Sequence, residues 1–187
     1  RSLAWTWTMQ LRRGLQTLHF KEVNQSKPFR QSIIINISKL NFAQFGLHEN
    51  VKTTLIAFLD QCHDGTHRTG ELLNQRALRS DHVKVGEHIA FEFNELNRPK
   101  AHKTSFCPAV VLHNKTRAYT SLRKCWNATS TSTHAFCHVT NDGRCVPGKH
   151  LTKSTVEGWL KPTFEFLKID DVTLHGCRAA GLTHQIM

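Results

Sequence analysis

The apolar residues of this chain come in short runs, and this pattern limits the folds open to it. The longest uninterrupted apolar run, Leu55 to Leu59, has five residues, whereas a helix that spans a bilayer needs about 20. No heptad pattern is sustained, which excludes a coiled coil. The 11 Phe and 4 Trp residues still provide large side chains for a core. We therefore expect no transmembrane segment and one soluble domain, with or without arms, in these 187 residues.

Strand-like and helix-like segments follow one another without regular βαβ alternation, which predicts an α+β fold. β-Branched or alternating apolar residues mark strands, good helix formers mark helices, and a proline inside an apolar stretch marks a break. The pattern predicts strands over 32–38, 88–93 and 109–112, a strand or helix start over 53–59, a helix over 71–79, and a break at Pro162 within 156–167.

The domain organisation follows from the same reading. Residues 1–50 are predicted to form a basic N-terminal arm and the first strand, and residues 51–187 a small mixed α+β domain. Within that domain, segment 98–151 is basic and contains the cysteines and histidines of a possible zinc loop. The expected fold is thus a small mixed α+β domain with irregular basic arms and a loop that zinc could stabilise.

Positive charge is concentrated in two segments. The chain has 25 Lys and Arg against 14 Asp and Glu. One segment, from Arg1 to His48, contains Glu22 as its only acidic residue, and the other, from Leu96 to Asn141, contains none. Basic side chains in such segments neutralise phosphates and release counterions, which predicts nucleic-acid binding; a solvated surface and an anionic membrane surface are the alternatives. The predicted phosphate contacts are Arg12, Arg13, Lys100, Lys103, Lys115, Arg117, Arg123 and Lys124.

A first candidate catalytic segment runs from Cys62 to Gly70, with the letters CHDGTHRTG. Its Cys-x5-Arg-Thr spacing resembles the phosphate loop of cysteine-dependent phosphatases. The resemblance implies a thiolate nucleophile at Cys62, a phosphate clamp at Arg68 and an assisting hydroxyl at Thr69, with a helix after the loop. The alternative is a histidine-rich polar loop with a structural role.

A second candidate segment combines three closely spaced metal-ligand residue types, Cys137, Cys145 and His150. Thiolate and imidazole ligands favour zinc, and we expect Cys125 as the fourth ligand, with Cys107 and His138 as alternatives. Disulfides or buried free thiols are the competing interpretation.

The Cys-x4-His-Leu end of this segment is similar to the zinc loop of the His-Cys box homing endonucleases. That resemblance implies a metal-dependent DNA endonuclease with His134 as general base.

Both catalytic resemblances lack an expected partner residue, while the capacity to bind phosphate stands without them. The sequence therefore favours a non-enzymatic component of a large ribonucleoprotein, namely an organellar ribosome in the mitochondrial matrix or another organelle, with RNA and neighbouring proteins as partners. The alternatives are the endonuclease, the phosphatase and a secreted cysteine-rich glycoprotein, which four Asn-x-Ser/Thr sequons would suit.

Overall fold

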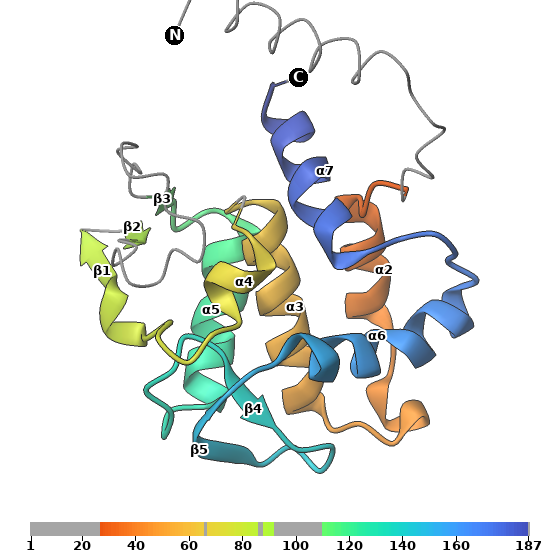
Figure 1. The fold of residues 1–187 in the computed structure, drawn as a ribbon, viewed down its shortest axis with the longest axis horizontal. Coiled ribbons are helices and arrows are strands. Elements are labelled where there is room, and N and C mark those ends of the chain that lie inside the picture. Colours follow the sequence, from red (N-terminus) through yellow and green to blue (C-terminus); the bar gives the residue numbers. More distant parts are fainter. Residues whose placement is uncertain (1–26, 66, 86–87, 92–109, 187) are drawn as a thin grey trace, which may run out of the picture.

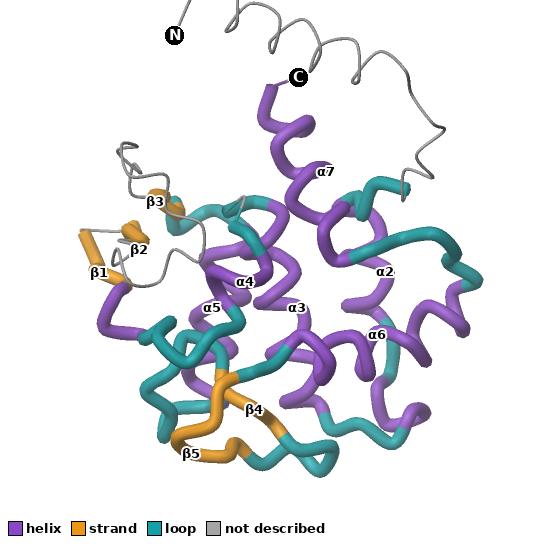
Figure 2. The backbone as a smooth tube through the Cα atoms, viewed as in Figure 1, coloured by secondary structure: helices purple, strands orange, loops and turns teal. Residues whose placement is uncertain are grey.

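The computed structural model describes residues 27–65, 67–85, 88–91 and 110–186. Helices and two small antiparallel sheets make up the fold (Figure 1, Figure 2), which confirms the predicted α+β class. In chain order the elements are α2 (Gln31–Lys39), η1 (Phe42–Phe45), α3 (Glu49–His63), α4 (Thr69–Leu72), η2 (Arg79–Asp81), β1 (His82–Val85), β2 (His88–Phe91), β3 (Val110–Leu112), α5 (Arg117–Ala128), β4 (Cys137–Val139), β5 (Cys145–His150), α6 (Lys153–Leu167) and α7 (Leu174–Ile186).

Helix α3 forms the centre of the fold, with α2, α5, α6 and α7 packed against it (Figure 1). The imidazole of His48 accepts a hydrogen bond from the backbone N–H of Asn50 and so caps the first turn of α3. Leu55 and Leu59 are fully buried, and the ring of Phe58 packs edge-on against Phe136 at a centroid distance of 5.8 Å. Burial all round this helix explains its nearly continuous apolar run, because every face meets a neighbour.

The predicted strand over 32–38 is wrong, because these residues form α2. Ile34 and Ile37 lie three positions apart, share one helical face and are fully buried. Burial of that face against α3 outweighs the preference of β-branched residues for strands. Phe29 and Phe42, which also precede residue 50, are fully buried in the same core.

The predicted helix over 71–79 is shorter and begins earlier, as α4. Asn74 ends it, because its side-chain amide donates to the carbonyl of Gly70 at 3.0 Å and its carbonyl oxygen accepts from the N–H of Arg76 at 2.7 Å. Such local side-chain bonds give the backbone an alternative to further helical turns. The expected break at Pro162 is also wrong, since α6 continues through it.

The two sheets lie at the edge of the helical body. Strands β1, β2 and β3 form one antiparallel sheet in that order, and β4 pairs with β5 in the other. The predictions for 88–93 and 109–112 are confirmed for the described residues, with Ile89 and Leu112 buried and opposite each other. In the described part of the chain, no helix is both long and apolar enough to cross a bilayer.

Candidate phosphate-binding site at the α4–α7 cleft

The cysteine of the first candidate segment lies inside a helix. Cys62 is the penultimate residue of α3 and 1% exposed. Burial, followed by the nearby Cys177 and Glu71, raises the pKa of its thiol well above the usual value. A phosphatase nucleophile must be a reachable thiolate at the start of a phosphate loop. The assignment of Cys62 as nucleophile is therefore wrong.

The loop after α3 folds back onto the end of that helix. The Nδ1 atom of His67 lies 3.2 Å from the carbonyl oxygen of Gln61. A Cβ atom at Gly65 would lie 2.5 Å from that same imidazole nitrogen, so the close approach requires glycine. Burial lowers the pKa of His67 to about 4, so the ring is neutral at pH 7 and serves to shape the loop.

Arg68 follows at the entrance of α4 and carries its charge into solvent. Its backbone N–H donates to Glu71 Oε2 at 2.7 Å, which fixes the start of the helix. Its guanidinium Nη1 lies 3.9 Å from Glu71 Oε1, and its side chain is 53% exposed. Arg68 is thus placed for contact with an anion, whereas Thr69 begins the helix beside it.

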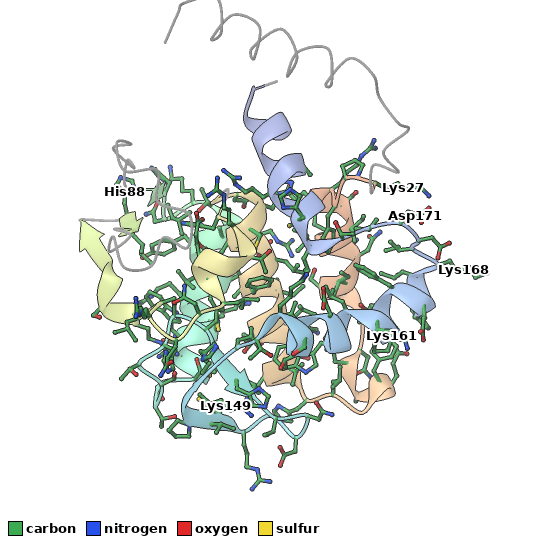
Figure 3. The ribbon with its side chains drawn as sticks, in the orientation of Figure 1. Lys27, His88, Lys149, Lys161, Lys168 and Asp171 are labelled. Carbon is green, nitrogen blue, oxygen red and sulfur yellow. The ribbon has the colours of Figure 1, made fainter. Side chains whose placement is uncertain are left out.

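Helix α7 is docked on the end of α3 by small residues. The Sγ atom of Cys177 donates to the carbonyl oxygen of Leu59 at 3.4 Å, and Gly181 lies against the carbonyl of His63. The segment before α7 is held by Lys27, whose Nζ lies 3.6 Å from Asp171 Oδ2 (Figure 3). This docking fixes which residues of α7 face α4.

A cleft of about 260 Å³ separates α4 from α7 and the start of α6. The residues that line it are Thr69, Gly70, Leu73, Lys153, Glu157, Leu174 and His175. Arg68 directly precedes this lining, and Arg178 lies one helical turn after His175 on the same face of α7. The positive charge of Arg178 adds to the lowering of the His67 pKa, which is caused mainly by burial.

The cleft is therefore lined by His175 and by Lys153, whose Nζ lies 3.4 Å from Glu157 Oε1, from parts of the chain that are distant in sequence. Arg68 precedes the lining residue Thr69, and Arg178 follows His175 by one helical turn. Guanidinium groups match the geometry of phosphate oxygens, and an exposed imidazole or ammonium adds a donor. The Cys-x5-Arg spacing singled out Arg68 in the sequence, whereas His175 and Arg178 were missed. Their i,i+3 spacing in an amphipathic C-terminal segment was the available signal, and it is weak without the fold.

The predicted phosphate contacts on α5 are brought only partly into position. Lys115, Arg123 and Lys124 are exposed. Arg117 instead points its Nε at Asp60, at 2.9 and 3.1 Å from the two carboxylate oxygens. Its charge is thereby matched within the protein, so Arg117 is a poor phosphate contact. The remaining predicted contacts, Arg12, Arg13, Lys100 and Lys103, lie outside the described residues.

The Asp60–Arg117 pair lies beside a second cavity. This cavity, of about 380 Å³, opens between α3 and α5 and includes Lys52 and Lys124 at its walls. The side chain of Asp60 is 1% exposed, and burial raises its pKa to about 6 even though Arg117 and Ser121 lower it. The pair links α3 to α5 at a position where the carboxylate has little water.

The predicted zinc ligands are only partly gathered. The Sγ atoms of Cys137 and Cys145 lie 3.0 Å apart, and Cys137 pairs with His150 across β4 and β5. Cys125 is fully buried on α5, with its Sγ 3.8 Å from Thr54 Oγ1. Among the described residues no group of three His, Cys, Asp or Glu side chains has the arrangement of a metal site. A zinc centre here stays a prediction.

The predicted general base, His134, is buried beneath the β4–β5 hairpin. Its ring lies 6.0 Å from that of His150, and its backbone N–H is bonded to Ser132 Oγ at 3.1 Å. A general base must reach the water it activates, and His134 is only 6% exposed. The geometry of the described residues therefore gives the endonuclease assignment no support.

Comparison with known proteins adds no assignment, since no family model and no curated protein matches the chain.

Proposed function

We propose that this protein binds nucleic acid, with a backbone phosphate held in the α4–α7 cleft. One observation carries the proposal: His175 of α7 and Lys153 of α6 line one cleft together with α4. Arg68 immediately precedes α4 in the chain, and Arg178 follows His175 by one turn of α7. Two guanidiniums with an imidazole provide several directed donors for phosphate oxygens. A nucleic acid is favoured over a small phosphate because the chain as a whole carries a formal charge of +11.

Further exposed cations lie on and just before α5. Arg123 and Lys124 belong to this helix, whose twelve residues contain no Asp or Glu, and Lys115 precedes it. Such side chains contribute salt-dependent affinity without reading the sequence of the bases. Membership of an organellar ribosome, with RNA as the ligand, remains the form of this proposal that the sequence favours.

Replacing both arginines of the cleft should weaken binding strongly. In Arg68→Gln/Arg178→Gln, we expect the dissociation constant for a labelled oligonucleotide to rise on the order of tenfold to a hundredfold, because each charge-assisted contact contributes about 1.5–3 kcal/mol and part is retained by its neighbours. Fluorescence anisotropy with RNA and DNA, each single- and double-stranded, measures the effect and identifies the preferred ligand.

The matched control is Arg144→Gln/Lys149→Gln, which removes the same charge from the β4–β5 hairpin. Lys149 lies on the opposite side of the view from α7 (Figure 3), and Arg144 is 82% exposed. Thermal melting of each variant separates lost binding from lost folding. Equal weakening by both double variants would mean that the affinity comes from diffuse charge and not from the cleft.

Phosphodiester cleavage is a second candidate, favoured by the same grouping of side chains. Guanidinium and imidazole groups around a phosphate also stabilise the charge that develops in its transition state. Cys62 cannot supply the nucleophile, because it is buried inside α3. Separating the same binding reactions on a denaturing gel tests this candidate. A cleavage product that forms with the wild type and is absent with Arg178→Gln would show that the protein is an enzyme.

A further inference from the structure

Two thiols face each other across the β4–β5 hairpin. Cys137 begins β4, Cys145 begins β5, and their Sγ atoms lie 3.0 Å apart. Seven residues separate them in sequence, and the turn between them is closed by bonds from Gly143 N–H to the carbonyl of Thr140 at 2.8 Å and from Thr140 N–H to that of Arg144 at 2.9 Å. The hairpin therefore holds the two sulfurs together before any bond joins them.

The guanidinium of Arg79 is anchored in the segment that precedes β4. Arg79 is held by the carbonyls of Thr129 at 2.8 Å and His134 at 3.0 Å, and it stacks on Trp126. Burial, with a further contribution from the neighbouring Cys145, raises the pKa of the Cys137 thiol to about 12.

The remaining described cysteines are more buried than Cys145. Cys62 and Cys177 are buried between α3 and α7, and Cys125 is buried on α5 beside Thr54. Cys145 is the one described cysteine with partial exposure. An oxidant from solvent can therefore reach Cys145 first, and Cys137 is the nearest thiol to resolve the product.

We propose that Cys137 and Cys145 are an oxidation site, at which a small-molecule disulfide such as glutathione disulfide converts the two thiols to a cross-strand disulfide. The thiolate of Cys145 attacks the glutathione disulfide, forms a mixed disulfide and releases one glutathione thiolate. The thiolate of Cys137 then attacks the Cys145 sulfur and releases the second glutathione. Two protein thiols are oxidised, one disulfide is reduced to two thiols, and the two thiol protons end on glutathione.

The bond would secure the contact between the hairpin and the start of α3. The carbonyl of Asn141 accepts from His48 N–H at 2.8 Å, and that of Gly143 accepts from the Asn50 amide at 2.9 Å. Both acceptors lie in the loop that the disulfide would close. A zinc ion and this disulfide would need the same two sulfurs, so each state excludes the other.

The test is oxidation of the reduced full-length chain with glutathione disulfide, followed by thiol counting and peptide mapping without reductant. We expect two thiols per chain to disappear, the mass to fall by about 2 Da once no glutathione remains attached, and the Cys137 and Cys145 peptides to be linked. In Cys137→Ser, Cys145 should instead retain one glutathione. Cys125→Ser should form the linked peptides as the wild type does.

Two results would overturn the proposal. One is linkage of other cysteine pairs, or no loss of thiols, under conditions that oxidise a model dithiol. The other is a chain that holds zinc and resists oxidation until a chelator removes it. Because peptide mapping is done on the wild type, the conclusion does not depend on whether a cysteine variant folds.

Discussion

Arg117→Ala should lose about 3–5 kcal/mol of its free energy of unfolding at pH 8, the largest effect that we expect from one surface-accessible side chain. The guanidinium is the partner of Asp60, whose carboxylate is 1% exposed, and removing the partner of a buried charge leaves that charge uncompensated. Urea unfolding gives the measurement. Arg123→Ala, on the same helix but exposed, is the control and should change the stability by less than about 0.5 kcal/mol.

The loss in Arg117→Ala should be smaller at pH 5. The folded-state pKa of Asp60 is about 6, raised by burial from 3.8, so the protonated form is favoured by folding. Protonated Asp60 therefore stabilises the folded state fully below about pH 4. This stabilisation, about 3 kcal/mol, is lost as the pH rises through 6. At pH 5 the carboxyl is mostly neutral and needs Arg117 less. An equal loss at both pH values would contradict this assignment, and Asp60→Asn should abolish the difference.

Gly181→Ala should both destabilise the protein and weaken nucleic-acid binding. A Cβ atom at this position would fall on the carbonyl oxygen of His63, a backbone atom that cannot rotate away. Overpacking of this kind costs about 1–3 kcal/mol, and here it separates α7 from α3. Since α7 carries His175 and Arg178, the cleft would lose its shape along with the contact.

Gly158→Ala is the matched control for that substitution. Gly158 is also helical, in α6, and a Cβ atom there meets no atom within 4 Å. We expect it to stabilise the protein by about 0.5–1 kcal/mol through helix propensity. Thermal unfolding and oligonucleotide affinity of both variants test the pair; unchanged affinity in a folded Gly181→Ala protein would show that α7 does not shape the binding site.

Local patterning predicted the elements that local interactions determine. The alternation from His88 and the β-branched run at Val110 become strands as expected. Ile34 and Ile37 form a helix because α3 buries them, and no periodicity of that short segment reveals its partner. Pro162 is tolerated because the buried face of α6, which includes Val156 and Thr163, continues on both sides of it.

The candidate site could likewise be predicted only in part from the sequence. Arg68 was found because a spacing motif singled out its loop, although the cysteine of that motif is buried inside α3. His175 and Arg178 join it only when α7 docks on α3, over more than 100 intervening residues, a contact that no local pattern contains. The charge of Arg117 was visible in the sequence, but its pairing with Asp60 was not.

The salt dependence of binding tests the cleft most directly. The slope of log affinity against log salt reports how many phosphates the protein neutralises, at about 0.9 per contact on duplex DNA and about 0.7 on a single strand. Arg68→Gln/Arg178→Gln should reduce the magnitude of the slope by about one to two contacts relative to wild type, while Arg144→Gln/Lys149→Gln should leave it unchanged. A slope that is the same in all three proteins would contradict phosphate binding in the α4–α7 cleft.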